Sequence, residues 1–281
     1  MPRVLCVGIA TVDIVNHVSG YPAEDSEVRA LQQQLRLGGN AANTALVLAQ
    51  LGDEVAWAGN LSDGPDAGLA TEAFAQHGVD ISHAAVIPGA HMPTSYVTLS
   101  RATASRSIVH YRDLPEYTAE AFNSIDLSIF DWIHFEGRAV DELVPMIQRA
   151  RGVCGLPVSL EVEKPRAGID ALFDEVDLLM FSHDYLRTRG ERPEQLLESL
   201  PGGGMATCTV GSQGAWARDF EGNVLHVQAH QPDQVVDTLG AGDVFNAGLL
   251  HAITRGMPMH VALSQANRLA GELCGREGLE L

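Results

Sequence analysis

Lysine is almost absent from this sequence. Of the 18 basic residues only Lys164 is a lysine, and it does not belong to a Gly-Lys-Ser/Thr segment. A Walker A loop needs that segment, because its lysine reaches the terminal phosphates of a nucleotide. P-loop chemistry is therefore excluded, and any nucleotide chemistry must use another phosphate cradle.

Positive charge of any kind is scarce. The 36 acidic residues outnumber the basic ones and give a formal net charge of −18 over 281 residues. Such a surface repels nucleic acids and anionic membranes, so neither is expected as a partner. An anionic ligand would have to bind through local groups, such as backbone amides at a helix N-terminus and a few arginines.

Cysteines are few, and long hydrophobic runs are missing. The four cysteines form no Cys-x-x-Cys pair, which favours free thiols in a reducing compartment. The apolar run at residues 4–10 is short and soon followed by Asp13, which argues against a signal peptide or a membrane span. We therefore expect a cytoplasmic protein. The eleven histidines show no ligand spacing, which disfavours a transition-metal site.

The order of the apolar segments predicts a doubly wound, mostly parallel α/β sheet flanked by helices. Short apolar runs without alternation are typical of parallel strands buried on both faces, and the amphipathic segments between them predict crossover helices. The expected strands are residues 4–10, 132–135, 158–162, 178–181 and 206–210, and the expected helices are 41–51, 67–77, 141–151, 244–254 and 260–274. Ligands of such sheets bind beyond the carboxyl ends of the strands.

Two stretches, at about 14–35 and 93–112, depart from this pattern. Polar and apolar residues alternate in them, which indicates strands with one solvated face and favours antiparallel pairing. Since both leave the core at a strand end, we predict a small β lid inserted into a single domain of residues 1–281; two decorative hairpins are the alternative. Exposed edges invite pairing with a second lid, which predicts a homodimer.

The sharpest motif is Asp-Thr-Leu-Gly-Ala-Gly-Asp at residues 237–243, followed by a helical segment. Glycines at a helix start let backbone amides approach a phosphate, and the helix N-terminus favours negative charge. Asp243 stands at that N-terminus, where it could accept the proton of an attacking alcohol. The alternative is that Asp243 only caps the helix.

A second motif opens the helix expected at residues 41–51. Gly38 and Gly39 precede Asn40 and Asn43, which lie on one face of the first turn. The two amides could bind sugar hydroxyls or merely cap the helix. Asp13, just past the first strand, is a further candidate ligand, or else a turn former.

Together, and in this order, these segments resemble those of the ribokinase-like (PfkB) carbohydrate kinases. The resemblance covers the whole chain, and residues 21–27, 132–138, 162–166 and 235–243 are most similar to the ketohexokinase subgroup, which phosphorylates fructose at the 1-hydroxyl. It implies an ATP-dependent phosphotransferase that uses Mg²⁺ and a small sugar substrate.

The resemblance implies a role for each matching residue. Sugar hydroxyls would be held by Asp13, Gly39, Asn40 and Asn43, with Asp243 as the base and the amides of Gly240, Ala241 and Gly242 as the anion hole. Nucleotide contacts are implied for Arg106, Gly211, Ser212, Gln213, Gly214 and Asn267. Without the resemblance, Arg106 would be a solvated charge, residues 211–214 an ordinary turn, and Asn267 a plain helix residue.

The resemblance also bears on cations. Asp237 matches a position near the family's monovalent-cation site, which implies K⁺. The family's Asn-x-x-Glu motif is absent, because residues 182–185 read Ser-His-Asp-Tyr. Glu161 and Glu163, at a strand's carboxyl end, are then the candidates for the magnesium region. Lys164 beside them could touch phosphate or merely neutralise the pair.

Two competing functions remain open. Within the class, the acceptor could be another sugar or a nucleoside, such as ribose, tagatose or adenosine. Outside it, the chain could be a non-catalytic sensor of sugar or nucleotide. The intact Asp243 and Gly-Ala-Gly segment count against the sensor, because a sensor needs no base.

Overall fold

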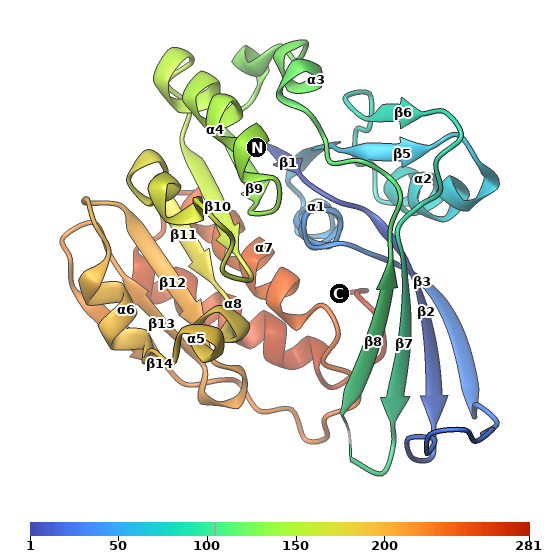
Figure 1. Ribbon diagram of the computed structural model, residues 1–281. Coiled ribbons are helices and arrows are strands. Elements are labelled where there is room, and N and C mark those ends of the chain that lie inside the picture. The colour runs from blue at the N-terminus through green and yellow to red at the C-terminus, as the bar shows by residue number, and fades with distance from the viewer. Residues whose placement is uncertain (104) are drawn as a thin grey trace.

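A central sheet of eight strands organises the computed structural model, which describes residues 1–103 and 105–281 (Figure 1). Its order is β14-β13-β12-β11-β10-β9-β1-β4. The strands are β1 (Arg3–Val7), β4 (Glu54–Ala58), β9 (Trp132–Glu136), β10 (Val158–Val162), β11 (Leu178–Phe181), β12 (Met205–Thr209), β13 (Ala215–Arg218) and β14 (Val224–Val227). Pairing is parallel from β12 to β4, and β13 and β14 form an antiparallel edge. The predicted fold class is confirmed.

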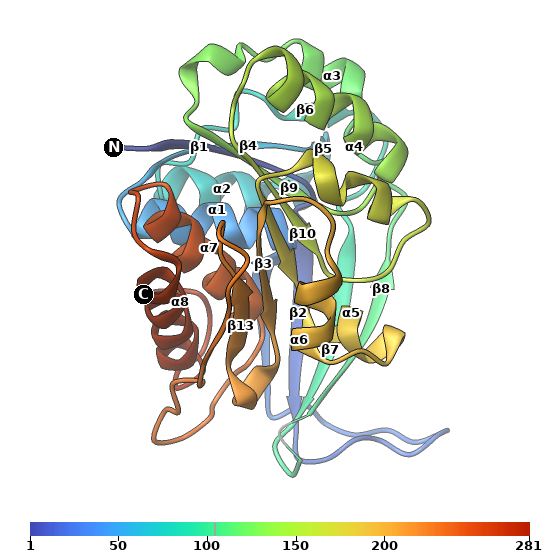
Figure 2. The same cartoon turned by 90° about the vertical axis from the view of Figure 1, so that its left-hand side faces the viewer.

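Helices cover both faces of this sheet (Figure 2). One face carries α1 (Asn40–Gln50), α2 (Gly68–Gln76), α7 (Ala241–Ile253) and α8 (Met259–Leu273). The other carries α3 (Ala119–Asn123), α4 (Val140–Ile147), α5 (His183–Arg189) and α6 (Pro193–Ser199). The helix expected at 141–151 begins as α4 and continues as a wide π-helical segment, Gln148–Val153. Each face has its own apolar core, as doubly wound sheets require.

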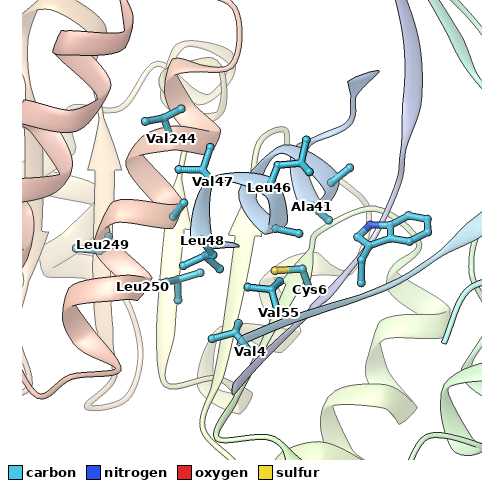
Figure 3. Packing of buried hydrophobic residues seen from close by; sticks show 14 of the residues in the cluster. Val4, Cys6, Ala41, Leu46, Val47, Leu48, Val55, Val244, Leu249 and Leu250 are labelled. Atoms are coloured by element: carbon cyan, nitrogen blue, oxygen red, sulfur yellow. The ribbon is translucent and has the colours of Figure 1, made fainter. Parts of the chain in front are cut away.

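The core that supports the site lies between α1, α7 and the sheet. Figure 3 shows Val47 and Leu48 of α1 among Val4 of β1 and Leu249 and Leu250 of α7. All five side chains are fully buried. This packing sets the two helices side by side although they are far apart in the sequence.

A second, smaller sheet has the order β3-β2-β7-β8 and is called the small sheet below. Its strands are β2 (Thr11–Val18), β3 (Gln32–Gly38), β7 (Thr94–Ser100) and β8 (Arg106–Tyr111). The two hairpins are antiparallel as expected, but β2 and β7 pair in parallel, so the expectation of purely antiparallel pairing is wrong. The reason is that β2 and β7 both run away from the main body, and β3 and β8 return (Figure 1). A two-stranded parallel sheet, β5 (Asn60–Ser62) with β6 (Ala85–Ile87), completes the strands.

The cysteines are free, with Cys6 and Cys208 buried and Cys154 exposed. Burial raises the pKa of the Cys208 thiol to about 12. Within the described part of the chain, no helix combines the length and the apolar character needed to cross a lipid bilayer.

His134 of β9 predicts a pH-dependent loss of stability. Its ring is fully buried, with Nδ1 2.9 Å from Ser159 Oγ, and burial lowers its pKa from 6.5 to about 4. Above pH 6.5 the imidazole is neutral in both the folded and the unfolded chain. Between pH 6.5 and about 4 mainly the unfolded chain binds the proton, so the free energy of unfolding should fall by on the order of 3 kcal/mol and then level off.

Urea unfolding of the wild type and of His134→Leu over this pH range measures the effect, because other titrating groups cancel in the difference. The wild type should lose stability relative to the variant below pH 6.5. A difference that stays constant with pH would contradict the prediction.

Candidate active site

Four buried carboxyl groups gather where the N-termini of α1 and α7 meet the carboxyl ends of strands in the central sheet. They belong to Asp13 of β2, Glu136 of β9, Glu161 of β10 and Asp243 of α7, and each residue is less than 9% exposed. Asp13 brings the small sheet to this cluster, because β2 is one of its strands. The clustering follows from the topology, since parallel strands end at one edge of the sheet.

Asp243 lies in the first turn of α7, as predicted. Its Oδ2 accepts a hydrogen bond from Asn43 Nδ2 at 2.6 Å, which joins the two predicted motifs directly. Burial raises the pKa of the Asp243 carboxyl well above its ordinary value, and the neighbouring carboxylates raise it further, against the effect of the Asn43 hydrogen bond. A raised pKa makes a carboxylate a stronger base.

The anion loop is the turn before α7. Gly240 is the N-cap residue and has a φ of 79°, the left-handed conformation that favours glycine. A Cβ there would also lie 2.7 Å from Leu279 Cδ2. The amides of Gly242 and Asp243 have no backbone acceptor in the described part of the chain. An anion could take that position, because the first turn of a helix leaves its N–H groups free.

The segment from Gly38 to Asn43, called the sugar motif below after its predicted role, begins α1. None of its side chains caps the helix. Gly39 has a φ of 98°, and a Cβ there would approach the Ile9 carbonyl oxygen to 2.3 Å. Asn40 Nδ2 donates to Glu161 Oε1 at 3.0 Å. The Asn43 Oδ1 atom is buried and has no hydrogen-bond partner among the described residues. The side-chain amides of Asn40 and Asn43 thus donate to two of the four clustered carboxyl groups and do not serve only their own helix.

Glu136 provides the missing cap of α1 from another part of the chain. Its Oε2 accepts the amide hydrogens of Ile9 at 3.0 Å and Ala41 at 3.2 Å. Its Oε1 lies 3.5 Å from Arg138 Nη1. The sequence interpretation used this stretch only as a mark of resemblance and missed its role. The position of Glu136 at the carboxyl end of an apolar strand was one signal that could have revealed it.

Asp13 lies within β2, not in a loop after the first strand. Thr11 Oγ1 donates to its Oδ1 at 2.8 Å, and burial raises the pKa of the carboxyl. Arg36 of β3 and Ser95 of β7 are its cross-strand neighbours on the same face of the small sheet. A turn-forming role is therefore excluded by its place in a strand.

Arg106 extends from β8 to the anion loop. Its Nη1 donates to Thr238 Oγ1 at 3.1 Å, although the two residues are 132 positions apart. The arginine is exposed, but its contact is with the loop that is predicted to hold phosphate. This contact brings together two parts of the predicted nucleotide site.

Residues 211–214 form a tight turn after β12, with a φ of 50° at Gly211 and 92° at Gly214. A groove of about 410 Å³ adjoins the turn. It is lined by Ser212, Gln213, Trp216, His226, Gln228, Ala229 and Gln231. Asn267 is buried and donates from Nδ2 to the Val227 carbonyl at 2.9 Å, which ties α8 to β14. A contact of Asn267 with adenine stays a prediction.

The acidic residues predicted to lie near K⁺ and Mg²⁺ already have other partners. Asp237 Oδ2 is paired with Arg36, and its Oδ1 accepts the Leu239 amide at 2.9 Å, so K⁺ could use this carboxylate only by displacing the guanidinium. Glu163 is paired with Lys164 at 3.0 Å. In residues 1–103 and 105–281, no group of three or more His, Cys, Asp or Glu side chains is arranged to hold a metal ion. Asp237 and Glu163 thus already have cationic side chains as partners.

The structure thus brings the buried Asp243 carboxyl, the first turn of α1 and the glycine turn before α7 together. The chain belongs to the pfkB family of carbohydrate kinases, whose family model matches residues 1–281. It is accordingly a sugar kinase.

Two curated relatives illustrate the family. Mouse (Mus musculus) ketohexokinase is 37% identical over 293 residues, covering 99% of this chain and 98% of the relative. An ATP-dependent ribose-1-phosphate kinase from Halopiger xanaduensis is 25% identical, covering 99% and 94%.

Solved structures agree on the fold. Ribokinase of Arabidopsis thaliana, complexed with ribose and ATP, matches with a TM-score of 0.80 at 22% identity, covering 99% of this chain and 93% of that one. Adenosine kinase from Sinorhizobium meliloti matches with a TM-score of 0.83 at 23% identity, covering 100% and 96%. At these identities the likeness shows the ribokinase-like fold with its separate small sheet.

Proposed function

We propose that this chain transfers the γ-phosphoryl group of ATP to a ketohexose, with fructose phosphorylated at the 1-hydroxyl. The observation that carries the proposal is the 2.6 Å hydrogen bond from Asn43 to Asp243, which joins the amide that we propose to bind a sugar hydroxyl to the carboxyl that we propose as the base. The ketohexose is suggested by the 37% identity with mouse ketohexokinase. ATP as donor is supported by the family and by the Arabidopsis ribokinase structure, which is a complex with ribose and ATP.

In the proposed reaction the acceptor hydroxyl gives its proton to Asp243 while its oxygen attacks the γ-phosphorus. The bond to the bridging oxygen breaks, and ADP leaves with the bonding electrons. Amides of the anion loop, at Gly240, Ala241 and Gly242, stabilise the charge on the transferring group. Exclusion of water favours the sugar over hydrolysis, and we propose the small sheet as the lid that provides it.

Magnesium is proposed to enter with the nucleotide, because it is commonly bound through one or two carboxylates together with substrate phosphates, and no three His, Cys, Asp or Glu side chains among the described residues are arranged to hold a metal ion. Bound to ATP, it would neutralise phosphate charge. We assign no K⁺ site to Asp237, because its carboxylate is paired with Arg36.

Arg106→Ala is expected to raise the KM for ATP about tenfold with a much smaller effect on the KM for the acceptor, because a lost charge-assisted contact is worth about 1.5–3 kcal/mol at most. Initial rates of ADP release measure both constants. Arg101→Ala, also exposed and in the same hairpin, is the matched control and should match the wild type. Equal constants for Arg106→Ala and Arg101→Ala would remove Arg106 from the nucleotide site.

We further propose a homodimer through the small sheet. Its outer face carries a row of neighbouring apolar residues, in which Leu35, Tyr96 and Val109 are 62%, 50% and 69% exposed, with Ile14 between the first two. Apolar side chains in such a row favour burial against a second copy. Light scattering should give twice the chain mass; a monomer mass at micromolar concentration would rule the dimer out.

An acceptor panel tests the function. With Mg·ATP, fructose, ribose, tagatose and adenosine are compared by ADP release, and the phosphorylated position is assigned by NMR. Fructose 1-phosphate is the expected product. Preference for ribose or adenosine would overturn the acceptor, and binding across the panel without ADP release would favour a sensor.

A further inference from the structure

Glu136 and Glu161 form a matched pair with unequal surroundings. They are direct neighbours on the parallel strands β9 and β10, and both are buried, at 4% and 5% exposure. Glu136 has two backbone amides and Arg138 as partners. Glu161 has one partner, Asn40, which donates to its Oε1 at 3.0 Å. Its Oε2 is buried without any hydrogen-bond partner in the described part of the chain.

An open carboxyl oxygen at this depth requires a donor or an acceptor from elsewhere. Leaving such an atom unpaired costs about 1–3 kcal/mol, and more when the group is charged. Burial raises the pKa of Glu161, and the carboxylates of Asp243, Glu136 and Glu163 raise it further. A sugar hydroxyl suits this atom in either protonation state, because a hydroxyl both donates and accepts.

A metal ion fits the same atom poorly. Magnesium takes near-octahedral oxygen ligands, and although acidic side chains gather near Glu161, no three acidic, cysteine or histidine side chains among the described residues are arranged to hold a metal ion. The other oxygen of Glu161 is held by the Asn40 amide, which is itself part of the sugar motif. The surroundings of Glu161 are therefore those of the acceptor site.

We propose that Glu161 is an acceptor-binding residue: its Oε2 hydrogen-bonds a hydroxyl of the sugar other than the reacting one, while its Oε1 orients the Asn40 amide. The inference rests on the proposed sugar-kinase function. It replaces the magnesium role that the strand-end position of Glu161 suggested. Because Asp243 takes the reacting hydroxyl, Glu161 contributes to the choice of acceptor.

The first test compares the wild type with Glu161→Gln, which keeps an oxygen for Asn40 but puts an amide group in place of the open oxygen. Calorimetric titration with fructose, without ATP, should show a dissociation constant raised about tenfold or more. The KM for ATP and the magnesium concentration for half-maximal rate should change less than twofold. Glu175→Gln, at an exposed position just before β11 and away from the strand ends that carry the site, is the control and should bind fructose like the wild type.

Thermal unfolding distinguishes a binding effect from a folding defect, and Glu161→Gln is expected to be as stable as the wild type because glutamine keeps the size of the side chain and an oxygen for Asn40. Unchanged fructose affinity would overturn the proposal. So would a shifted magnesium requirement with unchanged fructose affinity, which would restore the metal role.

A second test identifies the hydroxyl. Fructose analogues that each lack one hydroxyl other than the 1-hydroxyl are titrated into both proteins. One analogue should bind the wild type about tenfold more weakly than fructose does, yet bind Glu161→Gln no worse than fructose does. If every analogue loses the same factor in both proteins, Glu161 contacts none of these hydroxyls and the proposal is wrong.

The same data distinguish a failure of the proposed function from a failure of the role proposed for Glu161. Binding and turnover of sugars by the wild type test the proposed function, and the ratio of variant to wild type tests Glu161. If the panel shows another sugar as acceptor, the deoxy analogues of that sugar replace those of fructose.

Discussion

Asp243→Asn is expected to lower kcat about 10³-fold while changing the dissociation constants of ATP and acceptor less than about fivefold. Asparagine keeps the size of the side chain and an oxygen for the Asn43 amide, which donates to Asp243 at 2.6 Å. It cannot take a proton from the attacking hydroxyl. Initial rates of ADP release and calorimetric titration measure the two effects separately.

The control distinguishes catalysis from helix capping. Asp184 also lies in the first turn of a helix, α5, and its side chain is 49% exposed. Asp184→Asn should keep full activity. If Asp243 served only its helix, Asp243→Asn would lower the thermal stability and leave kcat near that of the wild type, and the assignment of the base would be lost.

Gly38→Ala is expected to raise the KM for the acceptor by about 10–100-fold and to leave the KM for ATP nearly unchanged. A Cβ on Gly38 would lie 2.3 Å from Asp13 Oδ2 and 2.5 Å from Thr11 Oγ1. These two side chains are buried and hydrogen-bonded to each other at 2.8 Å, so they have little room to move. The methyl group must displace the carboxylate that is predicted to bind the sugar, at a stability cost of about 1–3 kcal/mol.

The φ of Gly38 is not in the left-handed region, so an effect of backbone strain is not expected. Gly20→Ala is the matched control, because no atom lies within 4 Å of its added Cβ. An acceptor KM for Gly38→Ala equal to that of Gly20→Ala would show that Asp13 does not contact the sugar.

The fold was predictable where burial dictates composition. Strands β1, β9, β10, β11 and β12 are covered on both faces, so each appears in the sequence as an apolar run. Strands β4, β13 and β14 were missed, because they are only four or five residues long and β4 and β14 are the edges of the sheet. The parallel pairing of β2 and β7 was also beyond reach, since alternation reveals a solvated face and not a partner strand.

The residues of the site also differ in how well they could be predicted, because some belong to local motifs and others depend on distant contacts. Asp243 and Asn43 belong to local motifs whose glycines and helix starts can be recognised, and the structure brings them into contact. Glu136 caps α1 from 95 residues away, so no local pattern encodes the contact. One trace of it existed: α1 starts at a glycine with no capping side chain, which leaves amides in need of an acceptor. The pairing of Arg36 with Asp237 is more remote still, at 201 positions.

The contact between α1 and α7 also bears on how the protein is made. Asn43 and Asp243 are 200 residues apart, and α1 packs against α7 along its apolar face (Figure 3). A nascent chain on the ribosome holds α1 long before α7 is synthesised, so that face waits without its partner. Contacts of such separation form late and leave apolar surface open to chaperones. With Asp243 as the proposed base, phosphoryl transfer is expected to begin only after α7 has docked on α1, so enzymatic activity should report on this late step of folding.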